Sequence, residues 1–377
     1  MQIYVPDYYH KFHCLASACQ DNCCIGWEID IDEAHASFYR ELSGPFAKRM
    51  QHAVQWQDFP PHFQLVHGRC PFLNSENLCD LYLELGEKSL CEICTEHPRF
   101  HEWYGSRKES GLGLCCEAAA ELILNPANST KFVLTEDSRS TQSKEDSHDF
   151  LLSCFVQARD TAITIAQNRK FTLSERMAIL LAYAAEQQEC IDFESWESIS
   201  DIIKDYTDFS FCKDLLPQLR AEIAASAPPS HIADATLQFF LKLENYSKEW
   251  PVSLHHLRNT LSLSNAQLQP TSFANSAENL FVYFLFRYLL PAVRDSQFLS
   301  RTKFCILLTL LIGWLETDLH LQNKRISFSD YRRIAQLCSK ELEYSESNLH
   351  EILTACTDNS DFSYTSLLSL TFSEYHI

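Results

Sequence analysis

Cysteine is concentrated in the first third of this 377-residue chain. Ten of the sixteen cysteines lie in residues 1–116, in the closely spaced groups Cys14-x4-Cys19-x3-Cys23-Cys24, Cys70-x8-Cys79, Cys91-x2-Cys94 and Cys115-Cys116. Thiols at this density are either oxidised to disulfides or bound as thiolates to a metal. This part of the chain is therefore expected to fold around sulfur chemistry rather than around an ordinary apolar core alone.

The start of the chain bears on the choice between disulfides and metal. Residues 1–10 contain no basic segment, no apolar segment and no small-residue cleavage site of the kind found in secretion signals. We therefore expect a cytoplasmic protein, in a compartment where structural disulfides are rare. This expectation favours metal binding over a disulfide framework.

The spacing of the cysteines bears on the kind of metal. Zinc prefers four tetrahedral ligands, commonly from two Cys-x2-Cys pairs, and only Cys91 and Cys94 form such a pair. Adjacent residues such as Cys23 and Cys24 bind one zinc ion only through strained turns, whereas iron–sulfur clusters accept thiolates at varied spacings. An iron–sulfur cluster is our first interpretation, and zinc is the second.

Glycine divides the chain into two unlike parts. Seven of the eight glycines lie at or before Gly113, and only Gly313 follows. Glycine is needed where the backbone takes a positive φ or where another group approaches closely, so we expect an irregular first part and a helical second part. A stretch rich in Ser, Asp, Glu, Lys and Thr has the composition of a linker. We predict a cysteine-rich metal or iron–sulfur domain at 1–125, a polar linker at 126–149 and a helical domain at 150–377.

Helix signals support this division. Thr172 and Glu175 have the spacing of a capping box, and Ser327 precedes a second apolar-periodic segment. The expected helices include residues 31–42, 118–124, 173–188, 331–342 and the apolar stripes within 237–246 and 349–356, with a short strand at 27–31. The predicted fold is mainly α, with a small irregular, cysteine-rich, metal-centred N-terminal domain followed by a helical C-terminal domain.

The charge and the apolar runs limit the classes of partner. A net charge of −19 without a basic stripe argues against nucleic acid and favours basic partners, such as a lysine-bearing substrate. The longest apolar runs, 280–290 and 304–315, fall short of the roughly 18 residues of a membrane span, so we predict buried helices. Peripheral association with the inner membrane and oligomer formation remain open at this point.

Several motifs in residues 1–125 resemble the flagellin lysine-N-methylase family. They are Cys14…Cys19…Cys23-Cys24-Ile-Gly-Trp27 with Ile29-Asp-Ile-Asp32, Arg69-Cys-Pro-Phe-Leu73 with Asn77-Leu-Cys79, Cys94-x-x-His97-Pro-Arg99, and Leu114-Cys115-x-Glu117-Ala118-Ala119. Each piece is weak alone, but their order and combination are specific. The helical remainder matches the family in size only.

The resemblance implies transfer of methyl groups from S-adenosylmethionine to lysine ε-amines of flagellin, dependent on a cysteine-bound iron–sulfur (4Fe-4S) cluster. Carried over by motif position, the candidate metal ligands are Cys14, Cys19, Cys23, Cys24, Cys70, Cys79, Cys94 and Cys115. Cys91 and Cys116 stand where the family often has another residue, and they rank below these eight. Eight candidates exceed the four ligands of one cubane cluster, so two centres and a partly structural set are both open.

The binding mode of S-adenosylmethionine is a separate question. Ordinary methyltransferases use a glycine-rich turn between a strand and a helix, whereas this chain offers only Gly111-x-Gly113 and no βαβ alternation. One hypothesis is that the amino and carboxylate groups of the cofactor chelate an open iron of the cluster. Candidates for handling the substrate amine are Asp80, Glu102 and Tyr104, with Trp27 and Trp103 as aromatic neighbours of a cation.

Two other classes of function compete with the enzyme. One is a non-catalytic zinc- or cluster-binding module whose helical domain binds a flagellar partner protein. The other is a redox or metal-delivery protein that uses labile thiols. Metal content and a methyl-transfer assay would separate the three.

Overall fold

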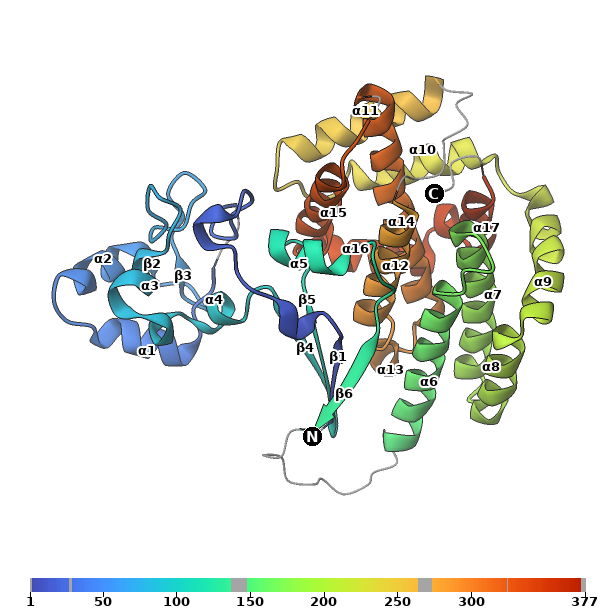
Figure 1. The fold of residues 1–377 in the computed structure, drawn as a ribbon, viewed down its shortest axis with the longest axis horizontal. Coiled ribbons are helices and arrows are strands. Elements are labelled where there is room, and N and C mark those ends of the chain that lie inside the picture. Colours follow the sequence, from blue (N-terminus) through green and yellow to red (C-terminus); the bar gives the residue numbers. More distant parts are fainter. Residues whose placement is uncertain (1, 27–28, 137–147, 264–272, 324, 374–377) are drawn as a thin grey trace.

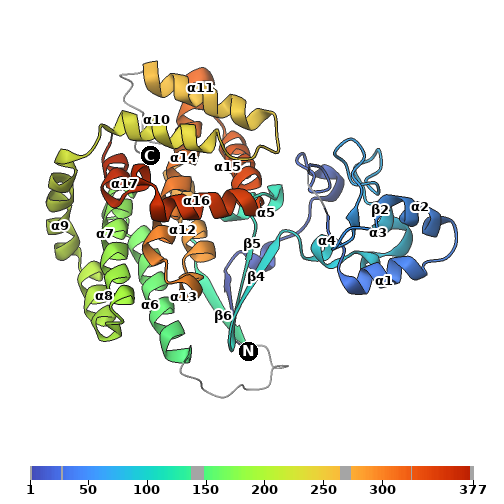
Figure 2. The ribbon, with the colours of Figure 1, turned by 180° about the vertical axis from the view of Figure 1, so that it is seen from behind.

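The computed structural model describes residues 2–26, 29–136, 148–263, 273–323 and 325–373. A large helical body and a smaller lobe lie on either side of a four-stranded sheet (Figure 1), and the view from behind shows the same separation (Figure 2). The described residues form seventeen α-helices and six short strands. The predicted mainly α fold is therefore confirmed.

The smaller lobe, residues 24–94, is called the cysteine-rich lobe. Its core contains Tyr39, Phe63 and Phe72, all 1% exposed or less, together with buried cysteines. Asp32 caps the first helix by accepting a hydrogen bond from the His35 backbone N–H at 3.0 Å, which confirms the helix expected there. The elements of the lobe are α1 (Glu33–Glu41), α2 (Pro45–Ala53), β2 (Val54–Gln55), β3 (His62–Phe63), α3 (Asp80–Leu85) and α4 (Glu92–Glu96). Of the strand expected at 27–31, residues 27–28 lie outside the described residues and Asp30 forms only an isolated bridge with His62.

The sheet between lobe and body has the strand order β4-β5-β1-β6. Its strands are β1 (Gln2–Pro6), β4 (Arg99–Tyr104), β5 (Arg107–Leu112) and β6 (Phe132–Glu136). β1 runs parallel to β5 and antiparallel to β6, so the first residues of the chain pair with segments more than a hundred residues away. The sequence analysis did not predict this sheet, because short strands with distant partners leave little local periodicity. β6 lies within the stretch that was predicted to be a polar linker.

The body consists of helices packed around α14. The window of α14 that is long and apolar enough to cross a bilayer is 89% buried within the protein, as expected for a core helix. The predicted buried helices over 280–290 and 304–315 correspond to α12, which ends at Tyr288, and α14. The body helices are α5 (Glu117–Ile123), α6 (His148–Ala166), α7 (Leu173–Asp192), α8 (Ile199–Thr207), α9 (Phe209–Glu222), α10 (Pro229–Phe240), α11 (Glu249–Leu263), α12 (Ala274–Tyr288), α13 (Ala292–Asp295), α14 (Phe298–Asn323), α15 (Phe328–Leu342), α16 (Glu346–Asp358) and α17 (Tyr364–Thr371).

Local signals in the sequence predicted several of these helix starts. Thr172 and Glu175 form the expected capping box at α7, and Ser327 and Asp330 form a second one at α15. The stripe expected over 237–246 is helical only as far as Phe240, where α10 ends. The starts of α7 and α15 were predictable because each capping side chain lies within four residues of the backbone group that it satisfies.

One hydrophobic core extends across the predicted domain boundary. Leu112, Ala120 and Ile123 are fully buried in the same core as the body helices, whereas the cysteine-rich lobe has a core of its own. A buried ion pair adds to this continuity, because Arg159 on α6 donates to both carboxylate oxygens of Glu109 on β5 at 2.8 and 3.0 Å. The segment predicted as one domain at 1–125 is thus distributed over two cores.

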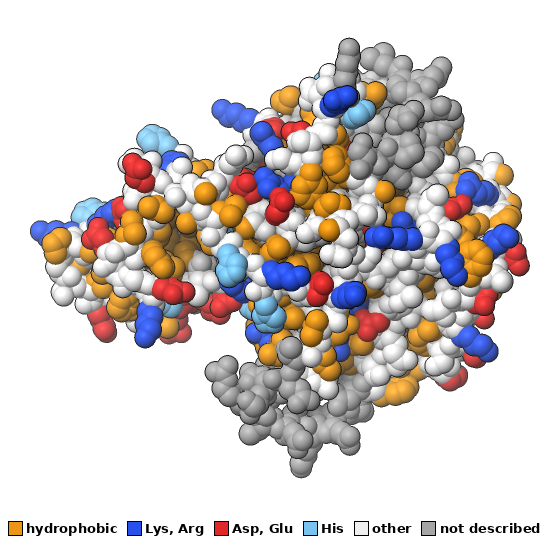
Figure 3. Space-filling view, viewed as in Figure 1, with side chains coloured by type: hydrophobic (Ala, Val, Ile, Leu, Met, Phe, Trp, Pro, Cys, Tyr) orange, Lys and Arg blue, Asp and Glu red, His pale blue; other side chains and the backbone are white. Residues whose placement is uncertain are grey.

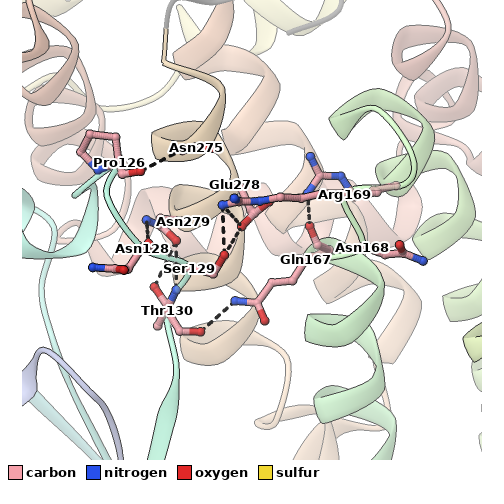
Figure 4. A network of polar contacts seen from close by, with 12 residues as sticks. Pro126, Asn128, Ser129, Thr130, Gln167, Asn168, Arg169, Asn275, Glu278 and Asn279 are labelled. Carbon is pink, nitrogen blue, oxygen red and sulfur yellow. Dashed lines mark hydrogen bonds and ion pairs between the residues drawn. The ribbon is translucent and has the colours of Figure 1, made fainter.

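The segment after α5 is fixed to the body by a polar network (Figure 4). The Asn279 side-chain amide donates to the Asn128 carbonyl oxygen at 2.9 Å. The Glu278 carboxylate accepts hydrogen bonds from Ser129 at 2.9 Å and from Arg169 at 2.9 and 3.0 Å. The chain leaving α5 is therefore held in place. Of the predicted linker, residues 137–147 lie outside the described residues.

Candidate functional site

A cavity of about 540 Å³ lies between the cysteine-bearing loops and helix α15. This volume is within the range of small-molecule sites, roughly 300–1,000 Å³. The wall combines segments that are far apart in the sequence: the loop before the cysteine-rich lobe, the start of α5, the start of α11 and one face of α15. The lining residues are Gln20, Asp21, Cys23, Ile25, Gly26, His97, Cys115, Glu117, Tyr246, Ser247, Glu249, Ser329, Arg332, Arg333, Gln336, Leu337, Lys340, Glu341 and Tyr344.

Helix α15 supplies the charged wall of this cavity. Arg332, Gln336 and Lys340 are four residues apart, so they lie on one face of the helix, and all three line the cavity. Arg332 forms an ion pair with Glu117 at 2.9 Å, and Lys340 forms one with Asp21. These pairs join α15 to the two cysteine-bearing segments on the opposite wall.

Glu117 is the best-held carboxylate of the site. One of its oxygens accepts hydrogen bonds from the Gln20 backbone N–H at 2.7 Å and from the Cys19 thiol at 3.4 Å. Burial alone would raise the pKa of Glu117, but these bonds and the charge of Arg332 outweigh it and lower that pKa. Glu117 is therefore ionised at neutral pH.

Tyr344 closes the inner end of the cavity beside Cys115. Burial raises the pKa of Tyr344 well above its ordinary value, so its hydroxyl stays protonated, and it shares a hydrogen bond with the Cys115 thiol. A methyl group added at Gly113 would lie 1.8 Å from the Tyr344 hydroxyl. Glycine is thus required at this position by the close approach of the tyrosine, while the Arg287 guanidinium lies 5.3 Å from the centre of the Tyr344 ring.

A second tyrosine, Tyr246, also lines the cavity. Both oxygens of the Glu341 carboxylate accept backbone hydrogen bonds at 2.8 Å, one from Tyr246 and one from Ser247. This contact fixes the chain before α11 against α15. Two further lining residues, Arg333 and Glu249, form an ion pair at 3.1 Å, and both side chains are more than half exposed.

His97 lies on the cavity wall next to the predicted ligand Cys94. Burial, reinforced by the positive charge of Lys340, lowers the pKa of His97 to about 4. Its imidazole is therefore neutral at pH 7. A base of that strength can take part in hydrogen bonds but does not hold a proton at neutral pH.

Four of the predicted metal ligands pack into the core of the cysteine-rich lobe. They are Cys24, Cys70, Cys79 and Cys94, and Cys91 lies in the same core. The Cys91 and Cys94 sulfur atoms are 3.5 Å apart. Two thiolates bound to one tetrahedral zinc ion at about 2.3 Å would lie about 3.8 Å from each other, so this pair is close to ligating distance.

The thiols of this group influence one another. The hydrogen bond with Cys91, then burial and then the charges of Cys91, Cys24 and Cys70 raise the pKa of Cys94. The same hydrogen bond lowers the pKa of Cys91. Burial raises the pKa of Cys70 to about 11. Thiols that are buried together in this way ionise more readily when a cation is bound among them.

The other predicted ligands lie outside the lobe core. Cys14 is exposed, Cys19 is bonded to Glu117, and Cys115 is buried beside the cavity. Burial raises the pKa of the neighbouring Cys116 to about 11, with smaller contributions from the charges of Cys23 and Cys14. Cys24, Cys70, Cys79, Cys91 and Cys94 thus form an inner group in the lobe, and Cys14, Cys19, Cys115 and Cys116 form an outer group, of which Cys115 lines the cavity.

Cys23 stands between these two groups and lines the cavity. A hydrogen bond with the Cys24 thiol is the main cause that lowers the pKa of Cys23 to about 7, and Lys340 contributes in the same direction. The paired Cys24 has a raised pKa for the converse reason. One thiol of the adjacent pair is therefore ionised far more easily than the other.

Both the geometry and the chemistry of the potential ligands decide whether a metal fits here. In the described part of the chain, no three His, Cys, Asp or Glu side chains are arranged to hold one ion, and all sixteen cysteines are free thiols. The inner group does supply soft, buried sulfur donors, the ligand type that zinc and iron–sulfur clusters take. The residues therefore fit such a group by their chemistry. Cys91, ranked low from the sequence, belongs to the inner group.

The residues considered for handling the substrate amine lie elsewhere. Asp80 pairs with Arg49 at 2.7 Å, and Glu102 pairs with Arg294 at 2.8 Å. Tyr104 is buried against the body core, so none of these three candidates lines the cavity. Trp103 is exposed on β4, and Trp27 lies outside the described residues.

The cavity wall formed by α15 was not predicted from the sequence. The signal was present, because Arg332, Gln336 and Lys340 recur at helical spacing beside the buried residues Tyr331 and Ala335. What the sequence could not indicate is that this polar face meets Glu117 and Asp21. Those contacts join residues more than two hundred positions apart.

Comparison with known proteins gives the following matches. A model of the FliB lysine N-methylase C-terminal domain matches residues 159–370, more than half of the chain. Lysine-N-methylases of Salmonella typhimurium and Salmonella choleraesuis are each 29% identical over 127 residues, 32% of this chain and 32% of theirs. The flagellar biosynthetic protein FliU of Salmonella muenchen is 29% identical over 129 residues, 32% of this chain and 75% of its own length. The aligned region thus spans about a third of the two methylases. No solved structure matches.

Proposed function

Because the chain belongs to the FliB lysine N-methylase family, we propose that it transfers methyl groups from S-adenosylmethionine to lysine ε-amines of flagellin. The observation that carries this proposal is the cavity of about 540 Å³, where charged side chains of α15 face two cysteine-bearing segments. The flagellar relative supports flagellin as the substrate. We also propose that the protein acts in the cytoplasm.

The charges of the cavity suit the cofactor. S-adenosylmethionine carries a carboxylate, an ammonium and a sulfonium, so a site for it needs groups of both signs. Arg332 and Lys340 supply positive charge, and Glu117 supplies an ionised carboxylate. The rings of Tyr246 and Tyr344 on the same wall are the type of group that attracts a sulfonium or an ammonium. This arrangement makes no use of a glycine-rich turn.

The substrate lysine must lose a proton before it can attack the methyl group. Its ε-amine has an ordinary pKa of about 10.4. Transfer out of water disfavours the ammonium form and lowers the pKa of an amine that enters the cavity. Arg332 and Lys340 act in the same direction, whereas the wall carboxylates of Asp21 and Glu117, with which they pair, act against it. Desolvation is therefore the effect that must free the amine of its proton. His97 is too weak a base to take this proton. The cavity walls also hold the amine nitrogen in line with the sulfonium methyl group, which is the alignment that methyl transfer requires.

The inner thiol group is the proposed metal site. Cys24, Cys70, Cys79, Cys91 and Cys94 would hold an iron–sulfur cluster, with zinc as the second choice. When bound, such a cluster supplies a Lewis-acidic iron and cross-links the loops of the lobe. Cys23 joins this group to the cavity, because it lines the wall and shares a hydrogen bond with Cys24.

The proposal is tested by methyl transfer with matched arginine variants. Protein purified without oxygen is assayed for iron and sulfide, then incubated with labelled S-adenosylmethionine and purified flagellin. We expect Arg332→Gln to lower kcat/KM by at least about 10-fold, because it removes a cavity charge. The control is Arg220→Gln on α9, since Arg220 is 52% exposed and does not line the cavity. Iron-loaded protein that binds flagellin without transferring label would support the non-catalytic module instead.

A further inference from the structure

Helix α3 exposes an apolar face that nothing in the described residues covers. Of its six residues, only Leu81 is buried, at 1% exposure. Tyr82, Leu83 and Leu85 are 48%, 57% and 36% exposed. The outer face of a surface helix is normally polar, so three large apolar side chains pointing outward are not explained by the packing of the helix itself.

The helix does not need these side chains to hold its place. Leu81 anchors it in the lobe core, and Gly86 ends it with a φ of +84°. The Ser89 hydroxyl donates to the carbonyl oxygens of Leu81 and Gly86 at 3.3 and 2.6 Å. Asp80, in the first turn, pairs with Arg49 at 2.7 Å. The inward contacts are therefore sufficient, and the outward face is free to serve another purpose.

Exposed acidic side chains form a margin next to this apolar face along the chain. Glu76, Glu84 and Glu87 are exposed, whereas the run 76–96 contains one basic residue, Lys88. On the lobe, Figure 3 shows hydrophobic side chains with both acidic and basic ones around them. A partner must therefore offer apolar side chains flanked by positive charge. A second copy is disfavoured, because it would bring the same acidic margin and a net charge of −19.

α3 is connected to the cavity through a short series of backbone contacts. Cys79, the residue that precedes α3, forms an isolated bridge with Leu73, whose N–H donates to the Cys70 carbonyl oxygen at 3.0 Å. The Cys70 N–H in turn donates to the Cys24 carbonyl oxygen at 2.8 Å, and the adjacent Cys23 lines the cavity. A protein segment bound on α3 can therefore continue towards the cavity.

We propose that Tyr82, Leu83 and Leu85 dock a segment of the protein substrate that carries apolar side chains beside lysine or arginine. The identity of the partner rests on the proposed function, whereas the surface rests on exposure and charge. Bound in this way, the substrate presents a neighbouring lysine to the cavity. Recognition of the protein is thus separated from recognition of the amine.

A binding experiment tests the apolar part. The metal-loaded full chain is titrated with purified flagellin, with no cofactor present. We expect Leu83→Glu combined with Leu85→Glu to raise Kd at least about 10-fold, because apolar contact is replaced by charge. The matched control is Phe193→Glu with Val252→Glu, since these residues are 79% and 67% exposed on the body. Equal Kd values for wild type and the α3 variant would overturn the proposal.

A charge-reversal pair tests the acidic margin. Glu84→Lys with Glu87→Lys is compared with Asp205→Lys with Glu351→Lys, which makes the same change in net charge on exposed residues of the body. We expect weaker flagellin binding and a flatter salt dependence only for the first pair. Equal weakening by both pairs would mean that only net charge matters, and it would refute a docking surface on α3.

The steady-state kinetics separate docking from catalysis. With intact flagellin, the Leu83→Glu and Leu85→Glu variant should show a raised KM and an unchanged kcat, while a short lysine peptide should show no change. Wild-type protein that binds flagellin through α3 but transfers no methyl group would refute the proposed function and support the docking surface. A wild-type dimer that becomes monomeric in this variant would identify α3 as a contact between copies and overturn the proposal.

Discussion

The cysteine-rich lobe and the helical body use the same residue in opposite ways. In the body, Cys305, Cys338 and Cys356 are buried in the apolar core, and burial is the main cause that raises the pKa of each. They act as small apolar residues. In the lobe, neighbouring thiols shift each other in opposite directions, as Cys91 and Cys94 do. Local density, rather than residue type, therefore decides whether a cysteine fills space or offers a ligand.

The two cores differ accordingly in what stabilises them. The body buries a continuous apolar core around α14, which is sufficient for a domain of its size. The lobe has a small core in which cysteines stand beside aromatic rings. Small modules of this kind commonly depend on a metal for part of their folding free energy. The comparison is tested most directly by removing the proposed metal.

The largest expected effect is loss of the lobe on metal removal. Chelation of protein purified without oxygen, or the substitution Cys94→Ala, should abolish protection from hydrogen exchange throughout residues 24–94. Protection of α7, α12 and α14 should remain, because their packing involves no clustered thiols. Hydrogen exchange measured by mass spectrometry checks both regions at once.

The matched control removes a cysteine from the other region. Cys305→Ala should destabilise the body by about 1–2 kcal/mol through lost packing and should leave iron content and the lobe unchanged. A lobe that keeps its protection without metal would show that its apolar core is sufficient alone. The distinction between the two regions would then be wrong.

The sequence was informative wherever the signal was local. The caps at Asp32, Thr172 and Ser327 were predictable because each side chain satisfies a backbone group three residues away. The mainly α fold class and the concentration of thiols in the first third of the chain were also predictable. These features need only composition and short-range spacing.

The sequence was silent wherever partners are distant. The pairing of β1 with β5 and β6, and the ion pair between Arg332 and Glu117, join segments with no common periodicity. The split of residues 1–125 over two cores was missed because apolar residues such as Leu112 and Ile123 do not indicate which core they enter. The candidate cavity could therefore be predicted only in part, through its cysteines.

The stability of the body should depend on pH through one buried carboxyl group. Glu316 on α14 is 3% exposed, and burial raises its pKa to about 8. The pKa of Glu316 is higher in the folded state than in the unfolded state. Its contribution to the free energy of unfolding is therefore complete at pH 4 and is lost as pH rises towards 8. Relative to acidic conditions, ionisation costs the folded body about 3 kcal/mol at pH 7.

The substitution Glu316→Gln should remove this pH dependence. Urea unfolding followed by the helical circular dichroism signal, which comes mainly from the body, should show a variant that gains stability over wild type between pH 5 and 8. The exposed Glu351→Gln serves as the control and should leave the slope unchanged. A wild-type stability that does not fall over this range would mean that Glu316 is solvated or paired.

The smallest expected effect lies beside the cavity, where Gly113, just after β5, approaches Tyr344. Gly113→Ala should cost about 2 kcal/mol, because its methyl group would overlap the tyrosine hydroxyl. Tyr344→Phe removes that oxygen, and the next atom lies at 3.0 Å, so the double variant should recover about 1 kcal/mol. Gly111→Ala is the control, because its methyl group would overlap the Phe100 ring instead and Tyr344→Phe should not rescue it. Additive costs for Gly113 and Tyr344 would show that the tyrosine does not pack on this glycine, and the coupling between cavity and sheet would be lost with it.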